Sequence, residues 1–184
     1  MDELVKAALK KWPNVPHCHG WLALDARGQW HMRDERAQAA GPFPQVKGSR
    51  VQHEKLREFI ERNYDTDGQG AWYFQNGPQR VYVDLEFTPW VWRVQGREQG
   101  FSVHSHTGLA ATPSAAWLDE QGRLYLETPL GPGLVHSLDV LAASEALEQG
   151  AWPGVAALQE LSWDGLRQRW GLQCRPRPRP AAAP

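Results

Sequence analysis

Two His-x-His pairs are the residues of this chain whose types and spacing are best suited to chemistry, and they lie at His17–His19 and His104–His106. Side chains two residues apart on a β-strand point to the same side, so each pair could present two imidazoles to one ion. Imidazole nitrogens, with Cys18 beside the first pair, are ligands that zinc and other late transition metals take from proteins. The spacing therefore suggests a zinc or related metal site at His17, His19, His104 and His106, and with it a metal-dependent enzyme.

The same histidines also have a simpler interpretation, as surface or core side chains with ordinary hydrogen-bond partners. A shared site requires the two pairs to lie close together, and metal-site motifs such as H-E-x-x-H do not occur in the sequence. Asp84 and Glu86 form an acid pair, but on the polar side of an alternating strand, where solvated carboxylates are expected. Without a nucleophile elbow or a phosphate-binding loop, the sequence leans away from an enzyme and leaves the question open.

Aromatic residues indicate a different kind of site. The chain contains ten tryptophans, and the stretch Ala71–Val94 reads as a central hairpin rich in aromatic and β-branched residues. Apolar side chains alternate regularly from Val81 to Phe87 and then change parity, so that Trp90 and Trp92 are out of phase. Since a shift of one residue turns every side chain to the opposite face, we expect a bulge or strand break at Thr88-Pro89.

The leading hypothesis is a non-enzymatic ligand-binding or regulatory module. Binding sites favour junctions between lobes, so we expect the ligand where Trp90, Trp92 and Arg93 approach His104 and His106. The alternatives are the metal-dependent enzyme described above and a protein-interaction subunit with an aromatic surface. Aromatic side chains that simply fill the core are a further interpretation. The sequence does not identify the small molecule, the protein partner or the oligomeric state.

Composition narrows the class of protein further. A chain of 184 residues with 41% hydrophobic and 22% charged residues is typical of globular domains. The net charge of −1 provides no general attraction to nucleic acid or to an anionic membrane. The sequence has no apolar run of roughly 18 residues and no secretory signal. Two cysteines give no disulfide framework, so we expect a cytoplasmic protein.

Periodicity and turn residues place the elements that would position these residues. The sequence predicts helices, hairpins and one loop at the following ranges: helices over 2–12, 49–63, 134–149, 153–161 and 162–170; hairpins over 20–33, 71–94 and 115–127; a strand over 101–106; and a loop over 36–48. Ser49 and Gln52 form a capping box for the second helix. The expected fold class is α+β, with mostly antiparallel hairpins packed against helices.

The elements fall into two small lobes with a weak internal repeat. The polar, glycine-flanked segment 95–100 suggests a boundary between a first lobe over 1–95 and a second over 96–172. Residues 173–184, which include RPRPRP, favour a disordered, extended tail. At an offset of 94 residues, Asp25 aligns with Asp119 and Gly28 with Gly122, which suggests either a duplication or two independent D-x-x-G turns.

Four stretches resemble an uncharacterised proteobacterial family with a domain of unknown function. They are WHMRDERAQ from Trp30, SRVQHEKLREFIERNY from Ser49, WYFQNGPQRVYVDLEFTPWVWR from Trp72 and AAWLDEQGRLYLET from Ala115. The order of elements is also similar to that of a second such family, which consists of two α+β lobes with a proposed ligand-binding or regulatory role. The resemblance implies a bacterial cytoplasmic protein with an α+β fold, and it assigns no catalytic residues.

Overall fold

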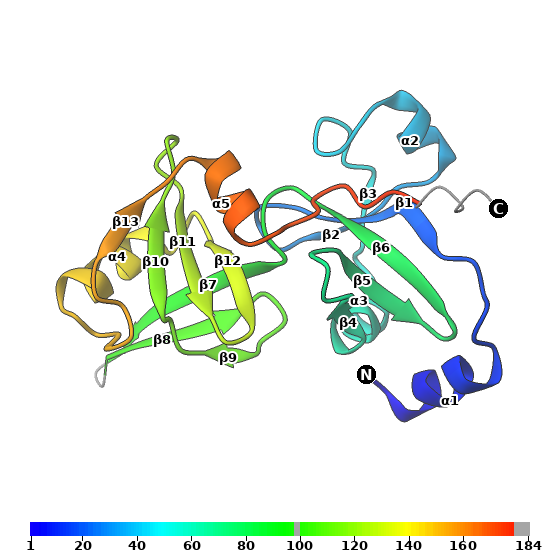
Figure 1. Cartoon of the computed structure of the whole chain (residues 1–184), viewed down its shortest axis with the longest axis horizontal. Coiled ribbons are helices and arrows are strands. Elements are labelled where there is room, and N and C mark those ends of the chain that lie inside the picture. Colours follow the sequence, from blue (N-terminus) through cyan, green and yellow to red (C-terminus); the bar gives the residue numbers. More distant parts are fainter. Residues whose placement is uncertain (98–99, 179–184) are drawn as a thin grey trace. The chain divides into compact units, whose positions relative to one another are not determined.

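The computed structural model describes residues 1–97 and 100–178 and divides the chain into two compact units. The first unit contains Met1–Asp25, Gln29–Glu86 and the chain from Gln173 onward, and the second contains Ala26–Gly28 and Phe87–Leu172. Each unit has its own sheet with helices beside it, as Figure 1 shows. The α+β fold class and the two lobes are therefore confirmed.

The first unit is built on a six-stranded sheet in the order β3-β2-β1-β6-β5-β4. Its elements are α1 (Glu3–Lys11), β1 (Cys18–Leu24), β2 (Trp30–Met32), α2 (Glu35–Ala40), β3 (Ser49–Arg50), α3 (Glu54–Arg62), β4 (Tyr64–Thr66), β5 (Trp72–Asn76) and β6 (Gln79–Leu85). Neighbouring strands are antiparallel except β1 and β6, which run parallel.

Helix α3 packs on one face of this sheet. Phe59 meets Phe74 of β5 edge-on, with ring centroids 5.4 Å apart, and Ile60 is buried. The helix begins later than the capping box predicts, because His53 caps it through Nδ1, which accepts from the amide of Leu56 at 3.4 Å. Ser49 instead pairs with β2 as part of β3.

The second unit is built on a seven-stranded sheet in the order β13-β10-β11-β12-β7-β8-β9. Its elements are β7 (Trp90–Arg97), β8 (Gly100–Ser105), β9 (Ala110–Ala111), β10 (Ala115–Leu118), β11 (Leu124–Thr128), β12 (Gly131–Val135), α4 (Val140–Glu148), β13 (Leu158–Glu160) and α5 (Trp163–Arg169). The pairs β12–β7 and β10–β13 are parallel, and the others are antiparallel.

The strand break predicted at Thr88-Pro89 is present, and it lies between a strand of the first sheet and a strand of the second. Strand β6 ends at Leu85 in the first sheet and β7 begins at Trp90 in the second. The Thr88 hydroxyl stabilises the break, since it donates to the carbonyl of Trp90 and accepts from the amide of Leu134, both at 2.8 Å. The division between units therefore follows Glu86, whereas the sequence analysis placed it after Gln95.

Other segments also differ from the expected structure. The range 36–48, expected to be a loop, contains most of helix α2, and Leu134 and Val135, expected to begin a helix, belong to β12. In the expected boundary segment, residues 95–97 belong to β7 and Gly100 to β8, with Gln95 opposite Ser102, and residues 98–99 lie outside the described range. The range 153–161, expected to be helical, contains the short strand β13, which lies parallel to β10. Turn chemistry explains the error at the boundary segment, because glycines that flank polar residues serve hairpins as well as linkers.

The D-x-x-G turns at Asp25 and Asp119 share their hydrogen-bond pattern. In each, the aspartate amide donates to a carbonyl four residues later at 3.1 Å, that of Gln29 or Arg123. The amide of that later residue donates back to the aspartate Oδ1 at 2.9 Å. The side chain six residues on, His31 or Tyr125, meets the aspartate Oδ2. The proposed repeat therefore extends to matched contacts in both turns.

The tail from residue 173 forms part of the first unit over the range that the structure describes. The backbone of Gln173 donates to the carbonyl of Gly70, and the carbonyl of Cys174 accepts from the amide of Leu85, both at 2.9 Å. Residues 173–178, named the strap below, therefore differ from the disordered tail that proline and arginine content suggested. The rest of the expected tail, 179–184, lies outside the described residues.

Candidate functional site

Parallel pairing of β1 with β6 brings a polar group of side chains together on the first unit. Cys18 lies opposite Val81 in the register. Because neighbouring residues on a strand face opposite sides of the sheet, the residues flanking this pair share one face. These residues are His17 and His19 on one side and Arg80 and Tyr82 on the other.

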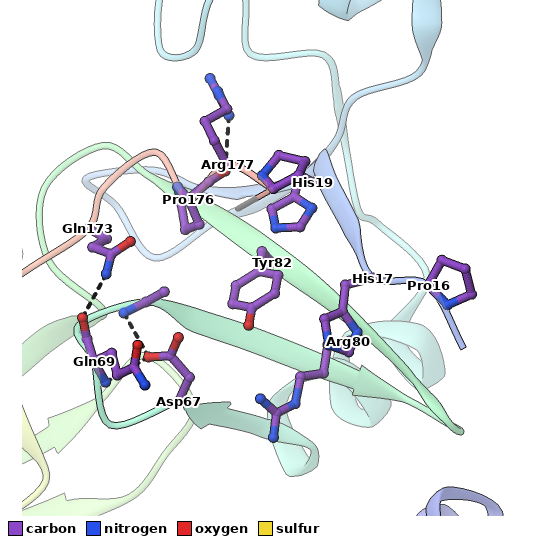
Figure 2. A pocket seen from close by; sticks show the side chains of 12 residues that line it. Pro16, His17, His19, Asp67, Gln69, Arg80, Tyr82, Gln173, Pro176 and Arg177 are labelled. Atoms are coloured by element: carbon purple, nitrogen blue, oxygen red, sulfur yellow. Dashed lines mark hydrogen bonds between the residues drawn. The ribbon is translucent and has the colours of Figure 1, made fainter. Parts of the chain in front are cut away.

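This face opens into a pocket of about 550 Å³, named the β1–β6 pocket and drawn in Figure 2. Its lining comes from β1 and β6, from the turn before β5 and from the strap. The lining residues are Pro16, His17, His19, Asp67, Gln69, Ala71, Arg80, Tyr82, Gln173, Pro176, Arg177 and Pro178. All of them belong to the first unit.

Ring contacts organise the pocket around Tyr82. The imidazole of His19 stacks on the Tyr82 ring, with centroids 4.6 Å apart and planes 14° apart. The imidazole of His17 meets the same ring edge-on at 5.8 Å. The guanidinium of Arg80 lies 4.3 Å from the centroid of Tyr73, a geometry suited to cation–π attraction. The two histidines thus point to one side, as their spacing predicted.

The positive charges in the lining of the pocket come from arginine rather than from histidine. Burial, followed by the charge of Arg80, lowers the pKa of His17, and burial, followed by the charges of His17 and Arg177, lowers the pKa of His19. Asp67 is the acidic lining residue, and its Oδ1 already accepts from the amides of Gln69 and Ala71. Two arginines and two neutral imidazoles therefore line the pocket, a set of side chains suited to an oxyanion.

The opposite face of the same strands is apolar. Cys18 and Val81 line a second pocket of about 250 Å³ together with α3 and neighbouring strands. The remaining lining residues are Trp21, Leu22, Met32, Leu56, Phe59, Ile60, Phe74 and Asn76. Strand alternation thus separates the polar pocket from the apolar one.

Trp90 and Trp92, expected to bind a ligand, are core residues of the second unit. Trp92 is fully buried and Trp90 is 5% exposed, and their rings stack with centroids 6.1 Å apart. Their indole N–H groups donate to the carbonyls of Leu130 at 2.7 Å and Leu126 at 3.0 Å, respectively. With their rings buried and their donors satisfied, they have little surface to offer a ligand, and ligand binding by these two residues stays a prediction.

The other residues of that expected site have structural contacts as well. The guanidinium of Arg93 donates to the Asp139 carboxylate, at 2.5 Å from Nε and 3.2 Å from Nη2. His104 lies opposite Arg93 in the β7–β8 register and is partly exposed. His106 Nδ1 accepts from the amide of Val91 at 3.3 Å. Arg93 and His106 thus have hydrogen-bond partners within the second unit.

The four histidines do not form a metal cluster in the described part of the chain. His17 and His19 belong to the first unit, and His104 and His106 to the second. Within residues 1–97 and 100–178, no group of three or more His, Cys, Asp or Glu side chains is arranged to hold a metal ion. Each pair alone supplies two nitrogens, fewer than the three or four protein ligands of zinc sites. The zinc hypothesis therefore has only the sequence spacing in its favour.

Sequence reasoning did not find Arg80, Tyr82 or Arg177. The alternation of β6 places Tyr82 on its polar face, but the sequence has no signal that β1 pairs with β6 or that the strap returns to them.

None of the helices in the described ranges has the length and apolar character needed to cross a membrane.

Comparisons with known proteins give a structural similarity and a family match. A crystal structure of a DUF1285 family protein from Silicibacter pomeroyi DSS-3 is similar over 79% of this chain and 84% of that chain, with 13% sequence identity and a TM-score of 0.49. A search of curated proteins gives no match. A family model described as "Protein of unknown function (DUF2946)" matches residues 1–177, so the chain belongs to that family.

Proposed function

We propose that the protein is a non-enzymatic ligand-binding module whose β1–β6 pocket takes a small molecule carrying a carboxylate or phosphate group. The observation that carries this proposal is that Arg80, Arg177 and two imidazoles line one pocket. Its volume of about 550 Å³ falls in the range of small-molecule sites, roughly 300–1,000 Å³.

Arginine is suited to this role because its planar guanidinium can donate two parallel hydrogen bonds to a carboxylate or phosphate. Neutral imidazoles can add N–H donors at neutral pH. Among the described lining residues there is no Ser, Thr, Cys or Lys to act as a nucleophile, and Asp67 is engaged by backbone amides. These features favour binding over covalent chemistry.

The binding test is an NMR titration of the histidine side chains with inorganic phosphate and, separately, with malonate. A bound anion stabilises the imidazolium, so saturation should raise the pKa of both His17 and His19. The two probes distinguish a phosphate-bearing ligand from a carboxylate-bearing one. The proposal fails if neither probe shifts the resonances of His17, His19 and Tyr82.

Arg80→Ala should weaken binding of the active probe by roughly 10- to 100-fold, the equivalent of a charged hydrogen bond of about 1.5–3 kcal/mol. Arg57→Ala is the matched control, because Arg57 lies on α3 with its Nε 3.8 Å from Glu61 and does not line the pocket. Equal affinities for the two variants would reject the assignment of Arg80.

A further inference from the structure

The strap forms one wall of the β1–β6 pocket. Gln173, Pro176, Arg177 and Pro178 all line it, opposite the side chains of β1 and β6. Figure 2 shows Pro176 and Arg177 beside His19, and the Gln173 side chain next to Gln69. Access to the pocket therefore depends on where this segment lies.

The first half of the strap is fixed by uncharged acceptors. The Gln173 side chain donates to the carbonyl of Gln69 at 2.7 Å. The Arg175 guanidinium donates to the carbonyls of Leu85 and Phe43, and it lies 5.2 Å from the centroid of the Phe43 ring. These contacts join the strap to β6 and to the loop before β3, so several hydrogen bonds hold this half in place.

The second half is held differently. The side chain of Arg177 is 60% exposed, and its Nη1 lies 3.5 Å from Oδ1 of Asp84 and donates to the carbonyl of Pro176 at 3.2 Å. The contact with Asp84 is a long ion pair rather than a close hydrogen bond. An exposed cation held in this way can be withdrawn more easily than the partly buried guanidinium of Arg175.

Asp84 is an unusual partner. It is 1% exposed, and neither carboxylate oxygen has a hydrogen-bond partner among the described residues. Besides Arg177, Arg33 forms an ion pair with it, with Nη1 at 3.6 Å, and Arg33 is anchored to the carbonyls of Val46 and Gly41. Burial raises the pKa of Asp84, against the lowering effects of Arg177, Arg175 and Arg33. Arg33 stays beside Asp84 if Arg177 leaves.

We propose that the strap is a gate of the β1–β6 pocket, in which Arg175 is the fixed end and Arg177 the releasable end that exchanges Asp84 for the anion of the ligand. Arg177 would thus be a second, specificity-determining contact to that anion. The exchange rests on the proposed function, whereas the contact between Arg177 and Asp84 can be tested without any ligand.

The ligand-free test measures backbone motion in the strap by heteronuclear NOE at the amides of Arg175 and Arg177. Arg177→Gln removes the charge from an exposed side chain and should increase motion at residue 177 while residue 175 stays rigid. Asp84→Asn should have the same effect from the other side of the ion pair. The gate is refuted if residue 177 is as mobile in the unmodified protein as in the Arg177→Gln variant, or if neither variant changes the mobility of residue 177.

The ligand test uses whichever of phosphate and malonate binds. Arg177→Gln should increase the dissociation rate of that probe on the order of tenfold, since affinity differences appear mostly in dissociation. Arg57→Ala should leave the rate unchanged. An unchanged rate in Arg177→Gln overturns the exchange of partners. If neither probe binds the unmodified protein, the proposed function fails, and the mobility measurements still decide whether Asp84 holds the strap.

Discussion

The turns at Asp25 and Asp119 have the same backbone hydrogen bonds, but the two aspartates, one in each unit, have different side-chain partners. Asp25 Oδ2 lies 3.0 Å from His31 Nε2 and 3.2 Å from Lys47 Nζ, which comes from 22 residues away. Asp119 Oδ2 accepts from Tyr125 at 2.9 Å and from Arg123 at 2.7 Å.

The two turns share the contact at the aspartate Oδ1 and differ in the contacts at Oδ2. The amide four residues after the aspartate donates to Oδ1 in both turns, so this contact belongs to the turn itself. The partners at Oδ2 are a titratable His and a half-exposed Lys in one unit, and a Tyr and an Arg four residues away in the other. We therefore expect Asp119 to be the more strongly held and the less dependent on distant residues.

The largest expected effect is that of removing the second aspartate. Asp119→Ala leaves the buried Tyr125 hydroxyl and the Arg123 guanidinium without their acceptor, and should destabilise the second unit by about 3–5 kcal/mol. Asp25→Ala should cost less, about 2–3 kcal/mol, in the first unit. Native-state amide exchange in β11 and β1 measures the two losses. Equal losses would remove the distinction between the turns.

The turn glycines provide a matched second test. Gly28 and Gly122 both have φ of +73°, so an added Cβ meets the same backbone strain at each, roughly 1 kcal/mol. At Gly28 it would also lie 2.5 Å from the Cβ of His106, whereas at Gly122 nothing lies within 4 Å. Gly28→Ala should therefore cost about 2–4 kcal/mol and Gly122→Ala about 1 kcal/mol in urea unfolding. Similar costs would show that His106 moves aside.

Acid should weaken the second turn through Asp119. Burial acts to raise the pKa of this carboxyl, but the hydrogen bonds from Arg123 and Tyr125 outweigh it, and the pKa is lowered. A lowered pKa in the folded state gives stability that is present above the ordinary carboxyl pKa, about 3.9, and is lost as pH falls through the lower folded value. Urea titrations at several pH values, followed through β11 resonances, should show this loss, and Asp119→Asn should abolish it.

The smallest effects concern single partners of Oδ2. Tyr125→Phe removes one buried donor and should cost about 1 kcal/mol. Lys47→Met removes a partly exposed cation that bridges Asp25 and Glu86, and screening should limit its cost to under about 1 kcal/mol. Thermal unfolding, with each unit followed separately by NMR, compares the two. A larger cost at Lys47 would reverse the expected ranking of the turns.

Local signals were sufficient to predict much of the fold. The hairpin around Asp119, the helix that begins at Trp163 and the break at Thr88-Pro89 follow from turn chemistry, periodicity and alternation, which depend on residues near in sequence. The start of α3 was missed because Ser49 has a tertiary alternative, pairing with β2, that outweighs its capping preference.

Only part of the candidate site could be predicted from the sequence. The common orientation of His17 and His19 follows from strand geometry, but their neighbours Arg80 and Arg177 are brought in by a parallel strand pair and by the strap. Such contacts join residues more than 60 positions apart and leave no periodic trace. The excess of tryptophan suggested a binding surface, yet Trp90 and Trp92 are buried with satisfied N–H donors.

The discontinuity of the first unit has a consequence for the order in which the protein is made. Synthesis from the amino end delivers β1–β6 first, then every strand of the second sheet, and only afterwards the strap. A nascent chain that has just passed Leu172 therefore contains both sheets but not the wall of the β1–β6 pocket. The second unit is inserted within the sequence of the first. Since domains tend to fold as they emerge, the second unit folds before the β1–β6 pocket acquires its final shape.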